Sequence, residues 1–190
     1  TIDYGPYGWL EDYNPGWTPN TTDSSTRRYR YGQQPQIAGW NLARLLEAMV
    51  PLMDDPEQLH DVLSAYTTCF DQHHNQMWVE KLGLNEFRNE DEDLVRTLNT
   101  LLQEVETDMT IFFRLLCTLQ SPNIESLTSA FYDETTVPVQ AWNEWLEAWW
   151  SRVEGQPNRE AMLQANPKYV LRNWMAQLAI DAAEKGDFSI

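Results

Sequence analysis

The sequence predicts a mainly α-helical protein, and three observations support this fold class. Apolar residues recur at three- and four-residue steps in several segments, each long enough for a helix. Glycine and proline stand at the ends of these segments, where helices stop. The one clearly β-prone stretch is Thr1 to Tyr4, which runs directly into the turn-forming pair Gly5-Pro6. We therefore expect a helical domain preceded by one short strand.

The expected elements follow in chain order. Residues 9–34 are rich in Asn, Pro, Gly, Thr and Tyr without a sustained period, which indicates a long ordered loop of the kind that often carries function. The expected helices then cover residues 35–51, 55–83, 89–105, 111–119, 139–153 and 169–185. The acidic stretch Asn89 to Asp93 fits a helix N-terminus, because negative charge is favourable near the positive end of the helix dipole.

Tryptophan is unusually frequent, with nine copies in 190 residues. Four of them lie in one expected helix, where Trp142, Trp145, Trp149 and Trp150 are spaced so as to share a face with Leu146. Because a large aromatic side chain buries much apolar surface, this face is expected to pack in the core.

Charge and hydropathy exclude several classes of partner. The formal net charge of −16 argues against nucleic acid and against an anionic membrane surface, both of which attract Lys and Arg. No apolar run has the length needed to span a bilayer, so we expect a soluble protein. The two cysteines, Cys69 and Cys117, fit burial or a reducing compartment better than a disulfide framework. Because the chain begins without Met and ends just after an expected helix, we also expect it to be a segment of a larger enzyme.

The candidate site residue is Asp3. Asp3-Tyr4-Gly5 at the end of a short strand has the form of the Asp-Phe-Gly element of protein kinases, in which the carboxylate holds Mg²⁺ against ATP phosphates. Magnesium prefers hard oxygen ligands, usually one or two carboxylates together with substrate phosphates. The alternative from the residues alone is an Asp that only stabilises the turn.

A longer string adds to this pattern. Residues 1–10, Thr-Ile-Asp-Tyr-Gly-Pro-Tyr-Gly-Trp-Leu, resemble the metal-binding segment of the SelO family, which are kinase-like protein adenylyltransferases. The resemblance continues through Asp12-Tyr13-Asn14-Pro15, Asn20 with Asp23, Arg28-Tyr29, Gln34-Pro35 and Trp40-Asn41-Leu42, and returns at residues 166–174, Asn-Pro-Lys-Tyr-Val-Leu-Arg-Asn-Trp. Between about residues 51 and 165 the match is mainly a series of amphipathic helices.

The resemblance implies a helical C-lobe portion of a protein-kinase-like fold. Residues 1–34 would form the metal-binding strand end and an activation-segment-like loop, and residues 35–190 a single helical region. Asp3 would bind Mg²⁺ and contact ATP, while the glycine-rich region, the nucleotide-binding Lys and the general base would lie upstream. AMP would pass from ATP to Ser, Thr or Tyr hydroxyls of protein substrates. The resemblance also implies a cytoplasmic location in a bacterium, or a mitochondrial one in a eukaryote.

Four further features carry open alternatives. Arg27, Arg28 and Arg30 could bind an anion or a substrate protein, or could simply pair with acidic residues. Cys69 and His73, with the neighbouring His74, have a helical spacing compatible with metal ligands, although burial of the Cys is the commoner outcome. Asn166-Pro167-Lys168-Tyr169 and Arg172-Asn173 are expected to form a buried polar joint between the last helix and the long loop, rather than to take part directly in catalysis. Some relatives carry a redox-active Cys where Pro19 aligns, so redox control has no evident counterpart in this sequence.

Two other functions remain open at the level of sequence. The first is a helical interaction or regulatory module, which exposed Trp clusters would favour because large exposed apolar patches mark interaction surfaces. The second is ordinary protein phosphorylation, which differs from adenylyl transfer in the orientation of the triphosphate, and these residues do not report that orientation.

Overall fold

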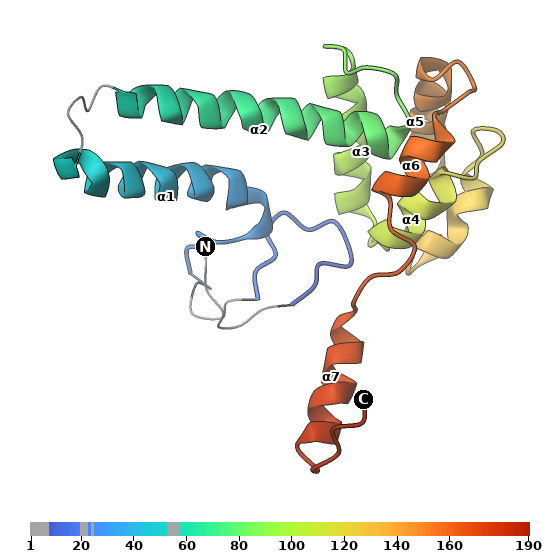
Figure 1. The fold of residues 1–190 in the computed structure, drawn as a ribbon. Coiled ribbons are helices and arrows are strands. Elements are labelled where there is room, and N and C mark those ends of the chain that lie inside the picture. The colour runs from blue at the N-terminus through green and yellow to red at the C-terminus, as the bar shows by residue number, and fades with distance from the viewer. Residues whose placement is uncertain (1–7, 20–22, 24, 53–57) are drawn as a thin grey trace. The chain divides into compact units, whose positions relative to one another are not determined.

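The computed structural model describes residues 8–19, 23, 25–52 and 58–190 (Figure 1). These ranges are mainly helical, which confirms the predicted class. Within them, β-structure is limited to an isolated antiparallel bridge between Thr107 and Phe131. The short strand expected at residues 1–4, and Asp3 with it, lie outside the described residues.

The helices close to their expected bounds are α1 (Gln34–Met49), α2 (Gln58–Leu82), α3 (Asp91–Glu104), α4 (Met109–Leu116) and α5 (Val139–Arg152). The last helix, α7 (Asn173–Ala183), begins four residues later than expected, because the chain at Arg172 is still extended. Elements that the sequence analysis did not anticipate are α6 (Arg159–Ala165) and the 3-10 turns η2 (Tyr31–Gln33), η3 (Val50–Leu52), η4 (Ile124–Ala130) and η5 (Glu134–Thr136).

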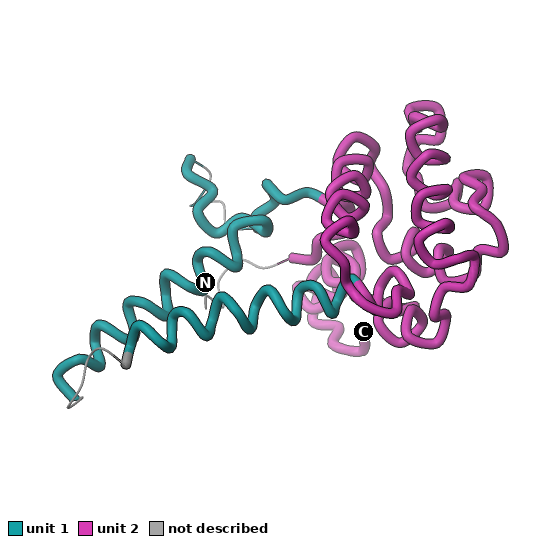
Figure 2. The backbone as a smooth tube through the Cα atoms, turned by 90° about the horizontal axis from the view of Figure 1, so that it is seen from above, with its two compact units in different colours: residues 1–7, 14–78 teal, residues 8–13, 79–190 magenta. Residues whose placement is uncertain are grey.

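The described chain forms two compact units (Figure 2). The first comprises residues 14–78 and the second residues 8–13 together with 79–190. In the first unit α1 and α2 lie side by side in opposite directions (Figure 1). Tyr66 on α2 donates a hydrogen bond to the carbonyl oxygen of Pro35 at 2.7 Å, and its ring lies against Gly39. Much of the apolar side of α2, including Val62, Phe70 and Met77, is exposed.

The core of the second unit is built around the tryptophan face of α5, as predicted for Trp142, Trp145 and Trp149, whereas Trp150 is only half-buried. Trp142 and Trp149 have no exposed surface, and Trp145 is 2% exposed. The indole nitrogens of Trp145 and Trp149 donate hydrogen bonds of 2.9 Å to the carbonyl oxygens of Leu94 and Leu82 respectively. A buried indole N–H is stabilised by such a partner, so these two bonds hold α5 against α3 and against the end of α2. The indole N–H of Trp142, in contrast, has no hydrogen-bond partner among the described residues.

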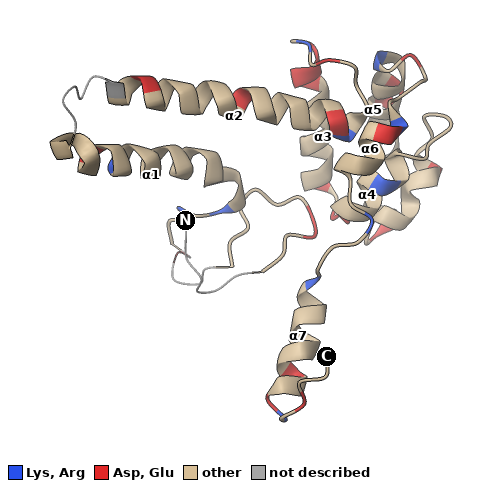
Figure 3. Cartoon of the chain, in the orientation of Figure 1, with Lys and Arg blue, Asp and Glu red and all other residues tan. Residues whose placement is uncertain are grey.

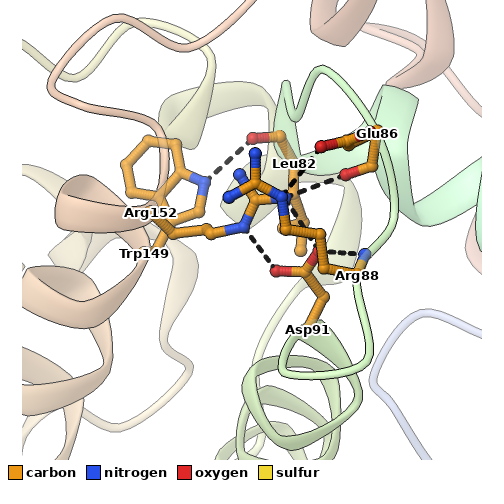
Figure 4. A network of polar contacts seen from close by, with 6 residues as sticks. All are labelled: Leu82, Glu86, Arg88, Asp91, Trp149 and Arg152. Carbon is orange, nitrogen blue, oxygen red and sulfur yellow. Dashed lines mark hydrogen bonds and ion pairs between the residues drawn. The ribbon is translucent and has the colours of Figure 1, made fainter.

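A buried ion pair ties the start of α3 to the end of α5 (Figure 4). Arg152 binds both carboxylate oxygens of Asp91, at 2.7 and 3.0 Å, and also donates to the carbonyl oxygen of Glu86 at 2.9 Å. Asp91 is 1% exposed at its side chain and also accepts the backbone N–H of Arg88. This bidentate arrangement satisfies a charge that would otherwise be costly to bury.

Gly83 ends α2 where the sequence predicts. Its φ of +67° is the left-handed conformation that glycine adopts most readily, and its carbonyl oxygen accepts a hydrogen bond from Asn158 N at 2.9 Å. A Cβ at this position would stand 2.7 Å from Met162 Sδ and 2.9 Å from Asn158 N. The turn therefore also brings α6 close to the end of α2.

Candidate functional site

The structure is informative about the chain immediately after the candidate metal segment. Asp3 itself lies outside the described residues, which begin at Gly8. From Gly8 to Tyr13 the chain belongs to the second unit, together with the long segment 79–190. The described contacts near the candidate metal segment are therefore those that attach residues 8–13 to the rest of the second unit.

The attachment is centred on Asn173, the first residue of α7. Its side-chain Oδ1 accepts a hydrogen bond from Trp9 N at 2.9 Å, and its Nδ2 donates to Trp9 O at 2.7 Å. One amide group thus pairs with both backbone polar groups of a single residue, as a neighbouring strand would do in a sheet. This fixes the position and the direction of the chain at Trp9.

Glu11 extends the attachment. Its Oε1 accepts from Asn173 N at 3.0 Å and from Asn173 Nδ2 at 3.2 Å. Its backbone carbonyl oxygen accepts the N–H of Met109, the first residue of α4, at 3.1 Å. Residues 9–11 are consequently held by the N-terminal ends of two helices, where backbone N–H groups and side-chain donors are available.

Arg172 supplies the ionic part of the same attachment. Its guanidinium lies 2.7 Å from Asp108 Oδ2 and 3.5 Å from Glu11 Oε2, and its side chain is 16% exposed. The hydrogen bond to Asp108 is the main reason why the pKa of Arg172 is raised above its usual value. Burial, followed by the nearby charges of Asp108 and Glu11, raises the pKa of Tyr132. We call the set Trp9, Glu11, Asp108, Arg172 and Asn173 the polar joint.

Both oxygens of Asp108 already have partners. Oδ1 caps α4 by accepting the N–H of Ile111 at 2.9 Å, and Oδ2 binds Arg172. Glu11 is likewise engaged, by Asn173 and by Arg172. These two carboxylates of the joint therefore serve structure, and they are not free to act as metal ligands.

The expected joint forms with two members of the string 166–173, but it is not buried as predicted: Asn173 is exposed and Arg172 is half-buried. Arg172 and Asn173 join the last helix to the start of the long loop, as predicted. Tyr169 is 81% exposed, and Lys168 is exposed with its ammonium over the Tyr169 ring. Asn166 is fully buried, but it lies in a separate cluster.

That separate cluster contains Lys81, which the sequence analysis did not single out. The Nζ of Lys81 donates to Asn166 Oδ1 at 2.8 Å and lies 3.9 Å from the centre of the Phe113 ring. Asn166 Nδ2 returns a hydrogen bond to the carbonyl oxygen of Lys81 at 3.0 Å and approaches Cys117 Sγ at 3.6 Å. Burial lowers the pKa of Lys81 to about 8, and burial likewise raises the pKa of the Cys117 thiol.

The three loop arginines make contacts other than the expected ion pairs. Figure 3 shows basic residues in the loop that leads into α1. Among the described residues, no carboxylate lies within ion-pair distance of Arg27, Arg28 or Arg30. Arg28 lies over the Trp40 ring at 4.2 Å, and Arg30 donates to the carbonyl oxygen of Arg27 at 3.0 Å.

The loop is organised by Asp23 instead. Its carboxylate accepts the N–H of Tyr29 and the hydroxyl of Thr26, each at 2.7 Å. The hydrogen bond from Tyr29 is the largest cause that lowers the pKa of Asp23 below its usual value. The arginine side chains are thereby presented from a defined turn.

The possible Cys and His ligands do not converge. His73 Nδ1 lies 2.7 Å from the carbonyl oxygen of Cys69, whereas His74 accepts a hydrogen bond from Trp78 Nε1 at 3.2 Å. In the part of the chain that the structure describes, no three residues of the His, Cys, Asp and Glu types are placed to share a metal ion. Cys117 is buried as expected, whereas Cys69 is exposed.

One further observation concerns membranes. No helix among the described residues combines the length and the apolar character required to cross a bilayer.

The similarity to known proteins extends over the whole chain, beyond the two strings that carry the sequence resemblance. The family model described as "Protein adenylyltransferase SelO" matches residues 1–190. Among curated proteins, "Protein nucleotidyltransferase YdiU" of Aromatoleum aromaticum is 46% identical over 199 residues, which cover 100% of this chain and 38% of the relative. Proteins of the same name from Flavobacterium johnsoniae and Rhodopirellula baltica are 46% and 47% identical over the whole chain and 39% and 40% of their own lengths.

The chain thus spans about two fifths of the length of the curated relatives that it matches. The match includes both the string around Asp3 and the string that contributes Arg172 and Asn173 to the polar joint. From the family match over all 190 residues and the identity to these relatives, the chain belongs to the SelO family.

Proposed function

We propose that the protein containing this chain is a protein adenylyltransferase, which transfers AMP from ATP to Ser, Thr or Tyr hydroxyls of protein substrates. The observation that carries the proposal is the family match over residues 1–190, which includes the Asp3 segment. In the reaction, the hydroxyl oxygen of the substrate attacks the α-phosphorus. The bond from that phosphorus to the bridging oxygen breaks, pyrophosphate leaves, and the hydroxyl proton passes to a general base expected upstream of Thr1.

The fold that accompanies this function is the helical C-lobe portion of a protein-kinase-like fold. We assign residues 1–34 to the metal-binding strand end and the activation-segment-like loop, and residues 35–190 to the helical region. The long amphipathic helices and the tryptophan core at α5 are compatible with such a lobe. Fold alone does not define the reaction, so the proposal depends on the Asp3 segment and its family context.

Asp3 is the proposed Mg²⁺ ligand and ATP contact. Its carboxylate is a hard oxygen donor of the kind that magnesium takes in phosphoryl-transfer sites. Glu11, the first carboxylate after Asp3 that the structure describes, is engaged in the polar joint and is therefore a weaker candidate for the metal. When bound, the ion would supply charge neutralisation for the phosphates as pyrophosphate leaves.

The implied cofactors are Mg²⁺ and ATP, and the implied partners are protein substrates. Because the chain has a net charge of −16, we propose neither nucleic acid nor anionic membranes as partners. A cytoplasmic location is proposed if the source is bacterial. By itself this chain should not catalyse the reaction, because the glycine-rich region, the Lys and the general base that position the nucleotide would lie in the upstream part of the protein.

Labelled ATP tests the reaction class directly. The full-length protein is incubated with a protein substrate pool, Mg²⁺, and ATP labelled at either the α- or the γ-phosphate. Adenylyl transfer places only the α-label on protein, since the β- and γ-phosphates leave together. Label from the γ-phosphate alone would establish phosphorylation and remove the proposal, whereas label from neither would support the non-catalytic module.

The alternative function, a helical interaction or regulatory module, would be favoured by exposed Trp clusters, but the face formed by Trp142, Trp145 and Trp149 is buried. Trp40 and Trp174 are exposed, and the exposed apolar neighbours of Trp174 include Leu171, Leu178 and Ile180. This surface is what still supports the alternative function.

A further inference from the structure

We infer that the groove between α3 and α5 binds a basic amphipathic helix of a protein partner. The groove lies wholly within the second unit and has a volume of about 450 Å³. Of the ten residues that line it, five belong to α5, and the other five belong to α3 and its N-cap residue Glu90. Such a groove would bind its partner whether or not the parent protein transfers AMP.

The walls of the groove are two helices that run in opposite directions. Near one end Asp91 binds Arg152, and further along α3 the carbonyl oxygen of Leu94 accepts the indole N–H of Trp145. The lining residues of α5 extend from Ala141 to Arg152, which corresponds to about 16 Å of helix. A long groove between two helices fits a third helix, whose apolar side chains enter it at three- and four-residue steps.

The groove also offers apolar surface to such a helix. Ala141 and Ala148 line it together with Trp145, whose ring is almost completely buried. Because alanine side chains are short, Leu or Met side chains of a partner can enter between the helices and leave water there. Arg152 and Asp91 line the same groove but bind each other (Figure 4), so neither needs a charged group from the partner.

The charge of the groove determines the sign of the partner. Four of the ten lining residues are acidic, and Arg152 is the basic one among them. Asp91 and Asp93 already pair with arginines of this chain. Glu90 and Glu144 are exposed, and neither forms an ion pair among the described residues. A helix with Lys or Arg beside its apolar face would place positive charge next to these two carboxylates.

Two other occupants fit the groove less well. A second copy of the chain would bring its own net charge of −16 toward Glu90 and Glu144, and the two copies would repel each other. Anionic lipid is disfavoured for the same reason. The shape of the groove and its charge therefore both favour a cationic helix.

The test measures binding of a fluorescein-labelled synthetic helix to the full-length protein by fluorescence anisotropy. The basic peptide carries Leu and Ala along one face and Lys and Arg along both borders of that face. The acidic peptide has Glu in place of every Lys and Arg. We expect the basic peptide alone to bind, and its binding to weaken as salt is raised, because salt screens exposed charges.

Two pairs of exposed glutamates distinguish the groove from a general attraction to an acidic protein. Glu90→Gln combined with Glu144→Gln should raise the Kd of the basic peptide about 5-fold, because each exposed ion pair contributes modestly. The control combines Glu92→Gln with Glu147→Gln. It removes the same charge from the same two helices at exposed positions that do not line the groove, and it should change the Kd less than about 2-fold.

A second pair of variants tests whether the space between the helices is occupied. Ala148→Trp places a large side chain in the groove and should raise the Kd at least about 10-fold, since it fills volume that the partner needs. Ser151→Trp is the control, because Ser151 is a small exposed residue of the same helix that does not line the groove. Both positions are exposed, so both variants should fold, and circular dichroism checks this.

Photo-cross-linking locates the bound helix without any substitution in the protein. The basic peptide, with benzoylphenylalanine on its apolar face, should cross-link to α3 and α5, as identified by mass spectrometry. Cross-links only to other elements would overturn the inference. So would absence of binding to the full-length protein, equal binding of the acidic peptide, or equal effects of the groove variants and their controls.

Discussion

The side-chain amide of Asn173 forms hydrogen bonds with both backbone polar groups of Trp9, 164 residues earlier in the chain. The residues on either side complete the joint, because Arg172 binds Asp108 and Glu11 while Glu11 accepts the N–H of Asn173. The two strings that most resemble the SelO family are thus in contact, and the contact lies directly after the proposed metal-binding segment.

The buried ion pair of Arg152 and Asp91 should be the most sensitive charged contact of the second unit. Arg152→Ala leaves Asp91, which is 1% exposed at its side chain, charged without its partner, and we expect the free energy of unfolding to fall by roughly 3 kcal/mol. Urea unfolding followed by circular dichroism measures the loss. Arg96→Ala is the control, because Arg96 pairs with Asp93 at the surface; its effect should stay below about 0.5 kcal/mol. Equal effects would contradict this account.

Two glycines with similar backbone angles allow strain and crowding to be separated. Gly186 has a φ of +84° and open space around an added Cβ, so Gly186→Ala should cost only the left-handed strain, about 1 kcal/mol. At Gly83 an added Cβ would also meet Met162 Sδ and Asn158 N. Gly83→Ala should therefore lower the melting temperature clearly more than Gly186→Ala. A smaller effect at Gly83 would mean that α6 does not pack against the end of α2 as described.

The burial of the tryptophan face predicts that substitutions at the neighbouring residues Trp149 and Trp150 differ in their effect on stability. Trp149 is fully buried and donates to the carbonyl oxygen of Leu82 at 2.9 Å, so Trp149→Phe removes a hydrogen bond and leaves a cavity that together cost about 2–3 kcal/mol. Trp150 is only half-buried, and Trp150→Phe should cost less than about 1 kcal/mol. Thermal unfolding of the two variants provides the comparison, and a reversed order would place the core on the other face of α5.

Lys81 predicts a pH dependence of stability. Its pKa in the folded protein is lowered to about 8 by burial, so between about pH 8 and 10 the unfolded chain binds more protons than the folded one. Stability from this group therefore rises with pH in that window, and below pH 8 the cost of the buried ammonium is fully present. Between pH 7 and pH 9 the contribution should be about 1 kcal/mol.

The measurement for Lys81 is a difference between variants. Unfolding free energies at pH 7 and pH 9 are compared for the unmodified protein, for Lys81→Met and for the exposed control Lys185→Met. Only Lys81→Met should flatten the rise, although it also leaves Asn166 Oδ1 without its donor and is expected to be less stable overall. An unaltered rise in Lys81→Met would show that the ammonium is solvated in the folded state.

The helical pattern was predictable because it is local. The apolar spacing of Leu94 to Leu102 and of Trp142 to Trp149 is periodic over more than two turns, and Gly83 supplies a stop that can be recognised without any tertiary contact. The short α6 escaped prediction because seven residues contain too few apolar positions to define a period. The 3-10 turn η4 also escaped prediction, because its i to i+3 hydrogen bonds give a shorter period than that of the α-helix, which was the pattern compared with the sequence.

The site differs from the sequence-based prediction because its contacts join residues that are far apart in the chain. The segment before Asn173 contains Tyr169, Val170 and Leu171, which read as the first turn of a helix, yet Arg172 stays extended so that it reaches Asp108 and Glu11. Lys81 gives no sequence signal at all, since its burial depends on Asn166 and Phe113. The sequence indicated the joint in one way, because Asn173 lies in the string 166–174 that resembles the SelO family.

The most direct test of the central claim compares Asp3→Ala with the unmodified full-length protein in transfer of label from α-labelled ATP to protein, with Asp93→Ala as a carboxylate control on the exposed face of α3. The account predicts that Asp3→Ala lowers the rate of labelling by at least about 100-fold, in the range for loss of a main electrostatic contributor to catalysis, while Asp93→Ala retains it. Unreduced labelling by Asp3→Ala would contradict the account.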